Sequence, residues 1–291
     1  EIFNIDVIVD SYMEYAKVFK DQITDTDTFL RNALGNKKIL LEGAQGAGLS
    51  IDHGTYPYVT SSDCTIGGLT KGVGLKQEDV DLTLGIVKAP YMTRVGEGSF
   101  PTEFGGTRSA EWCGTKGITR SVEKEKFPNV SVNETDEYLQ GIGIRKAGDE
   151  YGATTGRPRR TGWLDLPFLR YTTQFGSKDL ILTKLDVLDE CENILICNSY
   201  VYDGPDYNLG NEVLTKGKEI KVTIVDEEIM KYCKPVYTAF KGWLRSIRQI
   251  RDENEFPEEL KKIISFIETE VSAKTRIVSV GPDRNETIIL N

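Results

Sequence analysis

The glycine-rich segment Gly43–Ser50 is the first place where this sequence could do chemistry. It reads Gly-Ala-Gln-Gly-Ala-Gly-Leu-Ser after a short apolar run, and it nearly matches the phosphate-binding pattern G-x-x-x-x-G-K-[ST]. Leu49 stands where that pattern needs the lysine that reaches the β- and γ-phosphates. The segment is therefore either a plain strand-to-helix turn or a ligand loop in which Gln45 presents its amide to a polar base edge.

A hydroxyl-rich segment, Asp52–Ser62, follows this loop. Its consecutive hydroxyls at Thr60, Ser61 and Ser62 could bind a phosphate or a ribose, although a capped turn is the commoner reason for such a run. His53 is the single histidine of the chain. It could carry a proton, but a histidine in this setting is more often held structurally, and the residues alone leave both alternatives open.

Three arginines within four positions, Arg157, Arg159 and Arg160, lie in the segment Gly152–Gly162 of an acidic chain. A guanidinium group binds carboxylate or phosphate through two parallel hydrogen bonds. The flanking glycines and paired threonines add N–H and hydroxyl donors for the same anion. This pattern favours an anion site over a solvated cluster of charges.

Two strand ends carry further candidates. Thr183–Asp186 reads Thr-Lys-Leu-Asp after an apolar strand, and it resembles the Asn-Lys-x-Asp element of GTP-binding proteins. There the carboxylate accepts from two donors on guanine while the lysine stem packs on the ring. Ser279–Arg284 is a tight turn between two strands, for which no function is the default interpretation. Because open α/β sheets bind ligands at strand ends, we expect these segments to converge on one pocket.

The elements that must position these residues are apolar strands alternating with amphipathic helices. Helices are expected over 3–35, with a break near 24–28, and from Pro257 onward. Strands are expected at 38–41, 82–87, 179–183, 194–201, 276–280 and 287–290. This alternation predicts an α/β fold with a largely parallel sheet flanked by helices, like that of the P-loop NTPases, in a single domain over residues 1–291. Residues 105–150 lack periodicity and are expected to form a surface insertion.

Composition and charge disfavour several classes of function. Lys and Arg number 36 against 45 Asp and Glu, a net charge of −9, which argues against a nucleic-acid binder. No apolar run approaches the ~18 residues of a membrane span, so no membrane partner is expected. The five cysteines form no C-x-x-C pair, and with one histidine no Cys/His zinc pattern can be written. Scattered thiols are typical of a cytoplasmic protein.

Five sequence segments, taken together and in order, resemble the adenylosuccinate synthetase family. They are EGAQG (Glu42–Gly46), DHGTYPYVTSS (Asp52–Ser62), GATTGRPRRTGW (Gly152–Trp163), TKLD (Thr183–Asp186) and VGPDR (Val280–Arg284). Residues 105–150 lack a clear counterpart. The family implies a reaction in which GTP, IMP and L-aspartate give adenylosuccinate, GDP and phosphate, with Mg²⁺, in AMP synthesis. The γ-phosphoryl group of GTP first moves to the 6-oxygen of IMP, and the aspartate amine then displaces it.

Carried over residue by residue, the resemblance implies three sets of contacts. The IMP contacts would be Gln45, Thr60, Val95 and Arg157. The aspartate contacts would be Ala153, Thr154, Thr155, Gly156, Arg157, Pro158 and Arg159. The GTP contacts would be Arg159, Lys184, Leu185, Asp186, Ser279, Val280 and Gly281.

The sequence also departs from the family. The family's phosphate loop G-D-E-G-K-G-K, which carries its catalytic aspartate (also a Mg²⁺ ligand), does not occur here, and His53 does not match the motif of the family's general-acid histidine. The chain opens Glu1-Ile2-Phe3, without Met, inside a helical pattern. We therefore expect an N-terminally truncated piece, the C-terminal two-thirds of a homodimeric enzyme. Its catalytic residues and Mg²⁺ site would lie upstream, and it would have little turnover of its own. The alternative is a non-catalytic guanine-nucleotide or IMP binding module.

Overall fold

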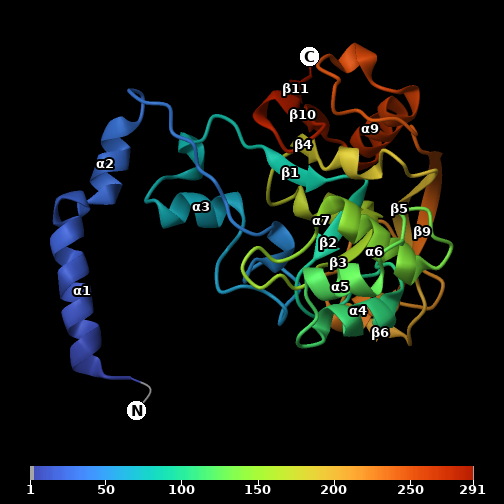
Figure 1. Cartoon of the computed structure of the whole chain (residues 1–291), viewed down its shortest axis with the longest axis horizontal. Helices are drawn as coiled ribbons and strands as arrows, with labels where there is room; N and C mark the ends of the chain where they lie inside the picture. The colour runs from blue at the N-terminus through green and yellow to red at the C-terminus, as the bar shows by residue number, and fades with distance from the viewer. Residues whose placement is uncertain (1–2, 291) are drawn as a thin grey trace.

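The computed structural model describes residues 3–290, which form two main sheets with packed helices and a helical arm standing to one side (Figure 1). The helices are α1 (Ile5–Phe19), α2 (Thr26–Ala33), α3 (Ile66–Gly72), α4 (Gly106–Gly114), α5 (Arg120–Lys126), α6 (Glu137–Gly148), α7 (Leu166–Thr172), α8 (Glu227–Met230) and α9 (Glu258–Val271). The strands are β1 (Gly85–Lys88), β2 (Tyr91–Arg94), β3 (Arg160–Asp165), β4 (Asp179–Thr183), β5 (Asn193–Tyr202), β6 (Tyr207–Asn208), β7 (Val213–Leu214), β8 (Glu219–Ile220), β9 (Cys233–Lys241), β10 (Lys274–Ser279) and β11 (Thr287–Ile289).

The first sheet has the strand order β1-β4-β10-β11. Strand β4 pairs in parallel with both β1 and β10, while β11 pairs antiparallel with β10. Leu180 and Leu182 of β4 are buried in the core. Because three neighbouring strands run parallel, their carboxyl ends meet at one edge, which we call the carboxyl edge. Ligands bind at such edges in open α/β sheets.

The second sheet has the order β2-β3-β5-β8, with β9 also paired to β5. Strand β3 is buried at every position and pairs in parallel with β5 and antiparallel with β2. The long β5–β9 ribbon is antiparallel. The predicted α/β fold, with a parallel sheet flanked by helices, is confirmed. Antiparallel pairs of the second sheet were not part of the prediction.

Helix α9 confirms the amphipathic pattern read from the sequence. Pro257 is its N-cap, and Glu258 and Glu259 occupy its first turn, where carboxylates suit the positive end of the helix. Its apolar face is buried against the core through Leu260, Ile263, Ile264, Ile267 and Val271. Each such side chain contributes roughly 1.5–3 kcal/mol when fully buried.

Residues 3–33 form an arm of two helices, α1 and α2, that Figure 1 shows apart from the sheets. Their predicted break is confirmed: Asp25 caps α2 by accepting a hydrogen bond from the backbone N–H of Thr28 at 3.1 Å. None of residues 3–33 is buried. Apolar side chains such as Ile5 and Val18 are 73% and 70% exposed.

Two expectations from the sequence are corrected. Residues 38–41 form no strand, and Leu40 is 89% exposed, because no described strand lies beside this apolar run to complete a ladder. Residues 105–150 lie only partly at the surface: α4 and α5 are mostly exposed, whereas α6 packs against β3 and buries Ile142 and Ile144 completely. Helix α6 shows no one-sided pattern because residues around most of its circumference are buried. At Gly143 the carbonyl of Ser131 lies so close that a Cβ would meet it at 1.9 Å.

Candidate functional site

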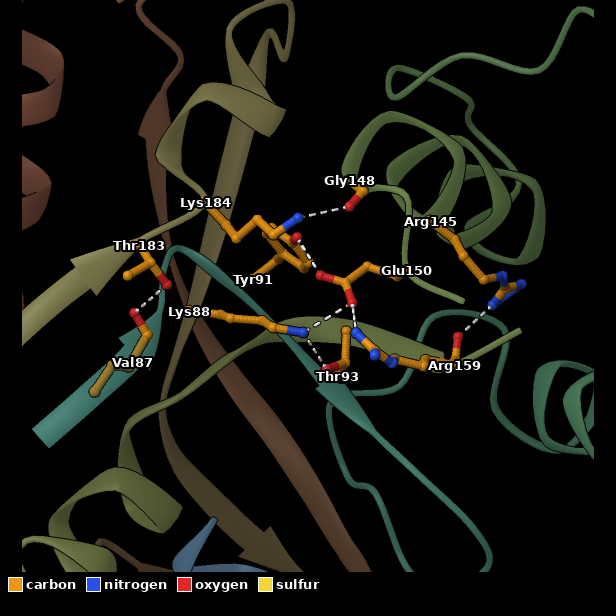
Figure 2. A network of polar contacts seen from close by, with 10 residues as sticks. All are labelled: Val87, Lys88, Tyr91, Thr93, Arg145, Gly148, Glu150, Arg159, Thr183 and Lys184. Atoms are coloured by element: carbon orange, nitrogen blue, oxygen red, sulfur yellow. Dashed lines mark hydrogen bonds and ion pairs between the residues drawn. The ribbon is translucent and has the colours of Figure 1, made fainter. Parts of the chain in front are cut away.

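A buried carboxylate, that of Glu150, lies at the carboxyl edge of the first sheet. It accepts hydrogen bonds from Nζ of Lys88 at 2.8 Å, from the hydroxyl of Tyr91 at 2.7 Å and from Nη1 of Arg159 at 2.7 Å. Figure 2 shows these donors converging on Glu150 from different segments of the chain. The Lys88 ammonium also donates to Oγ1 of Thr93 at 2.7 Å. One carboxylate thus joins the β1–β2 connection to the segment that leads into β3.

The charges around Glu150 leave a positive surplus. Burial by itself would raise the pKa of Glu150, but the Lys88 ammonium and the three hydrogen bonds hold that pKa below its ordinary value. Burial lowers the pKa of Lys88 against the attraction of Glu150, and Arg159 and Lys184 lower it further by repulsion. Two cations therefore contact the carboxylate and a third, Lys184, lies near enough to repel Lys88, and such a surplus of positive charge attracts an anionic ligand.

Lys184 and Asp186 follow β4 at the same edge. Lys184 adopts a left-handed backbone conformation with φ of 65° and donates from Nζ to the carbonyl of Gly148 at 2.8 Å. Such a conformation is costly for a residue with a Cβ and concentrates at functional sites. The carboxylate of Asp186 accepts from Nη2 of Arg248 at 2.8 Å and from its Nε at 3.2 Å. Leu185 between them is completely buried and is a packing residue.

A hollow of about 680 Å³ opens beside Asp186, lined in part by Val187, Asp189, Arg245 and Arg248. This volume lies within the ~300–1,000 Å³ typical of small-molecule sites. Burial raises the pKa of Asp189, although Trp243 donates to its carboxylate at 2.9 Å. The hollow therefore presents carboxylates and guanidinium groups on one wall.

The turn Ser279–Gly281 follows β10, the next parallel strand. The hydroxyl of Ser279 donates to the carbonyl of Gly281 at 2.8 Å, and Val280 is completely buried. The hydrogen bond to Asp186 raises the pKa of Arg248, and the field of Glu286, which accepts from the N–H of Asp283 just after this turn, adds to the effect. The predicted GTP residues of β4 and β10 thus follow two adjacent parallel strands, and their assignment to GTP remains a prediction.

The loop Gly152–Pro158 is closed by its own backbone. The N–H of Gly152 donates to the carbonyl of Arg157, and the N–H of Gly156 donates to the carbonyl of Gly152, both at 2.8 Å. Gly156 has a φ of +65°, which favours glycine. The residues at the tip of the loop are exposed: Ala153, Thr154 and Thr155. Hydroxyl donors of the loop are accordingly open to solvent.

The three arginines of this region do not form one cluster. Arg160 is buried and makes two hydrogen bonds to Glu103, at 2.9 and 2.5 Å, so its role is structural. Arg159 binds Glu150, as described above. Arg157 is exposed and donates from Nη2 to the carbonyl of Gly114 at 3.1 Å.

The structure brings Gln45 and Thr60 to the same thiol, that of Cys64. Its sulfur lies 3.8 Å from Oε1 of Gln45 and 3.6 Å from Oγ1 of Thr60. Gln45 is exposed and has a φ of 59°, while Thr60 donates to the carbonyl of Leu49 at 3.0 Å. Two predicted IMP residues are therefore neighbours.

The other predicted IMP residues stand in different surroundings. Val95 follows β2 and is 59% exposed. Its neighbour Arg94, the last residue of β2, donates to Oγ1 of Thr55 at 2.8 Å and so connects the hydroxyl-rich segment 52–62 to β2. Within residues 3–290, no hydrogen bond or ion pair joins Arg157 to Gln45, Thr60 or Val95. The assignment of these four residues to IMP remains a prediction.

His53 is held as a structural residue. Its ring stacks on Phe175 with the ring centroids 4.1 Å apart, and its backbone carbonyl accepts from the hydroxyl of Tyr171 at 2.8 Å. These contacts favour the structural alternative over that of a proton carrier.

The sequence analysis missed Glu150, Lys88, Tyr91 and Arg248. Weak signals were present, since Lys88 ends an apolar strand and Glu150 lies two residues before the glycine-rich loop. Their partners lie about 60 positions away in the sequence, so only the folded topology reveals the contacts.

In the part of the chain that the structure describes, no group of three or more His, Cys, Asp or Glu side chains could hold a metal ion. The described residues therefore provide no complete set of protein ligands for Mg²⁺, which commonly binds through one or two carboxylates together with substrate phosphates. The described helices also include none that is long and apolar enough to cross a bilayer.

Comparison with known proteins identifies the family. The model of the adenylosuccinate synthetase family matches residues 1–288. Adenylosuccinate synthetase of Thermodesulfovibrio yellowstonii is 41% identical over 97% of this chain and 56% of its own length. That of Chlorobium chlorochromatii is 38% identical over 99% and 56%. The fully ligated adenylosuccinate synthetase structure from Plasmodium falciparum has a TM-score of 0.78 and 35% identity, covering 99% of this chain and 59% of that one.

The fold and site define an α/β protein with an anion-attracting group of cations at the carboxyl ends of parallel strands. Within that class, the chain belongs to the adenylosuccinate synthetase family. It spans 56% of the length of these curated relatives, so the expected share of two-thirds was too high.

Proposed function

We propose that this chain supplies substrate-binding parts of a ligase that joins L-aspartate to IMP at the expense of GTP. The products are adenylosuccinate, GDP and phosphate, formed through a 6-phosphoryl-IMP intermediate in AMP biosynthesis. The observation that carries this proposal is the carboxyl edge, where Lys88 and Arg159 bind Glu150 and the charges of Lys184 and Asp186 lie nearby. Phosphate and carboxylate groups are the ligands that such a surplus of cations favours.

In this proposal the guanine ring of GTP lies against Asp186. The carboxylate of Asp186 accepts hydrogen bonds from the ring N–H and the exocyclic amino group of guanine. These two donors replace Nε and Nη2 of Arg248, which bind the carboxylate in the structure. Adenine offers no such donor pair to a carboxylate, so the site selects guanine. The turn Ser279–Gly281 closes over the base, and Arg159 reaches the phosphates.

The IMP and aspartate assignments rest on the loops. Gln45 and Thr60 would meet the base edge and the 5′-phosphate, with Val95 and Arg157 near the ribose. The exposed loop Ala153–Arg159 would receive L-aspartate through the hydroxyls of Thr154 and Thr155 and through Arg157. These groups bind and orient the substrates.

We assign no catalytic acid, base or Mg²⁺ ligand to the residues of this chain. The sequence contains no G-D-E-G-K-G-K loop, and His53 is engaged in stacking. We therefore propose that the chain alone has little turnover and that the homodimeric, cytoplasmic, Mg²⁺-dependent enzyme of the family is its functional context. Sustained phosphate release by this chain from GTP, IMP and L-aspartate would contradict this. The alternative, a non-catalytic nucleotide-binding module, predicts binding without turnover in every context.

The guanine assignment is tested by Asp186→Asn with calorimetric titration of GDP and ADP. The variant loses the charge on a double acceptor, so we expect GDP affinity to fall about tenfold while ADP affinity changes less than about twofold. The matched control is Asp179→Asn at the opposite end of β4, which breaks the comparable pair with Arg276. Equal losses for GDP and ADP would argue against guanine recognition.

A further inference from the structure

The turn between α4 and α5, residues Gly114–Arg120, touches the 152–158 loop at two points. We call it the connector. The backbone N–H of Arg120 donates to the carbonyl of Gly156 at 2.9 Å. The guanidinium of Arg157 donates to the carbonyl of Gly114 at 3.1 Å. Each partner thus contributes one backbone carbonyl, and the contacts fall at the two ends of the connector.

A buried network of hydrogen bonds around Glu123 holds the helices on either side of the connector. The carboxylate of Glu123 in α5 has no exposed surface and accepts from Nε1 of Trp112 at 2.6 Å, from Nε of Arg145 at 3.0 Å and from the hydroxyl of Tyr151 at 2.7 Å. It therefore ties α4, α5 and α6 to the first residue before the loop. Removing charge-assisted bonds from a buried group is costly, so the connector holds a fixed position.

The base of the loop is fixed as well. Nη1 of Arg145, which is buried, donates to the carbonyl of Arg159 at 2.9 Å. Nη2 of Arg120 also forms an ion pair with Asp149 at 2.8 Å, but both side chains are about half exposed to solvent, so this pair adds little. Between these fixed points the tip residues Thr154 and Thr155 remain exposed. The connector restrains the loop without covering the hydroxyls that face solvent.

We propose that Arg120 is a positioning residue for the 152–158 loop. Its N–H fixes the carbonyl of Gly156 and thereby holds the loop in a conformation that receives a dicarboxylate. The choice of L-aspartate as that dicarboxylate rests on the proposed function. A loop that is ordered before binding loses less conformational entropy when the ligand arrives, so the restraint strengthens binding.

Two variants of one residue separate the N–H from the side chain. Arg120 is the first residue of α5, where proline is well accepted, and Thr119 before it has the extended backbone (φ −130°, ψ 172°) that proline requires. Arg120→Pro removes the N–H donor together with the side chain. Arg120→Ala, the matched control, removes only the side chain and its ion pair with Asp149.

The measurements are amide hydrogen exchange across residues 152–158 and calorimetric titration of L-aspartate and GDP, all on the full chain. For Arg120→Pro we expect exchange in the loop to quicken about fivefold and L-aspartate affinity to fall about fivefold, with GDP affinity unchanged. For Arg120→Ala we expect the loop exchange rate, the L-aspartate affinity and the GDP affinity each to stay within about twofold of the unaltered chain. A loss of affinity for L-aspartate but not for GDP indicates a positioning role, because a general loss of structure would weaken the binding of both ligands.

Three outcomes would overturn the proposal: unchanged loop exchange in Arg120→Pro, equal weakening of both ligands, or Arg120→Ala behaving like Arg120→Pro. Should Arg120→Pro fail to fold, the unaltered chain gives the answer, because bound L-aspartate must then slow exchange of the Arg120 amide and an unchanged rate refutes the role. If the unaltered chain binds GDP but no L-aspartate, the proposed function is wrong in assigning L-aspartate to this loop. The exchange rates of residues 152–158 in the two variants then decide by themselves whether Arg120 restrains the loop.

Discussion

Helices α1 and α9 are of similar length, 15 and 14 residues, and both have apolar side chains at helical spacing, yet only one of them is buried. Five side chains of α9 lie in the core, whereas no side chain of α1 is buried. The contrast shows that hydrophobic periodicity predicts a helix but does not predict what the helix packs against. A surface of complementary shape must come from elsewhere in the fold.

The two helices should therefore differ in what stabilises them. An isolated helix of this length is marginal in water, and α1 has only local support, such as its N-cap Asn4, which accepts from the N–H of Val7 at 3.3 Å. Helix α9 gains most of its stability from burial against β10 and α7. Three tests of this difference follow in decreasing order of expected effect: truncation of a side chain in each helix, pH titration of a buried carboxylate that caps α7, against which α9 packs, and deletion of the arm.

The largest effect is expected from truncating matched isoleucines. Ile263 of α9 is completely buried, whereas Ile8 of α1 is 42% exposed. Ile263→Ala should lower the free energy of unfolding by about 2–5 kcal/mol through lost burial and a new cavity, and Ile8→Ala by less than about 0.5 kcal/mol. Urea unfolding of both variants measures this. Similar losses at the two sites would show that α1 is packed in solution.

A second effect is the pH dependence of stability that arises from Asp165, the buried N-cap of α7. Burial raises the pKa of Asp165 from 3.8 to about 6, although Tyr200 and the N–H of Phe168 donate to its carboxylate. Between pH 4 and 6 the unfolded chain has lost this proton and the folded chain has kept it. This group's contribution to stability therefore falls as pH rises, by about 3 kcal/mol in total.

The test compares Asp165→Asn with the unaltered chain at several pH values. The free energy of unfolding of the unaltered chain, minus that of the variant, should decrease between pH 4 and pH 7 and then level off. A difference that stays constant with pH would show that Asp165 has an ordinary pKa.

The smallest effect is expected from deleting residues 1–33. Because none of residues 3–33 is buried, the thermal midpoint of the remaining chain should shift by less than about 2 °C. Differential scanning calorimetry measures this, with Ile263→Ala as a control whose midpoint must fall clearly. A large fall in the thermal midpoint after deletion would mean that the arm stabilises the rest of the chain through contacts with its surface.

Several elements could be predicted from the sequence because their signals are local. Strand β4 and helix α9 are marked by apolar runs and caps that act within a few residues. The strand expected at 38–41 was wrong because a strand needs a neighbour, and a run of four apolar and basic residues does not say whether one exists. Helix α6 escaped prediction because burial around most of its circumference removes the one-sided pattern.

The candidate site follows the same rule. Lys184, Asp186 and Arg159 could be singled out from the sequence because they stand in short patterns beside strands, although their assignment to ligands remains a prediction. Glu150 and Lys88 are isolated in the sequence, and only the pairing of β1 with β4 and the return of the chain through α6 bring them together. Arg248 is 62 positions from its partner Asp186, and no local signal marks it.

The three hydrogen bonds that Glu150 accepts have a consequence for how the 152–158 loop can move. Lifting the stem of the 152–158 loop from the sheet would break the Arg159 bond and leave a buried negative charge short of a partner, so that movement is rare. The tip carries no such restraint beyond the connector. Motion of this loop should therefore be confined to brief excursions of its tip residues, while Arg159 stays bound to Glu150.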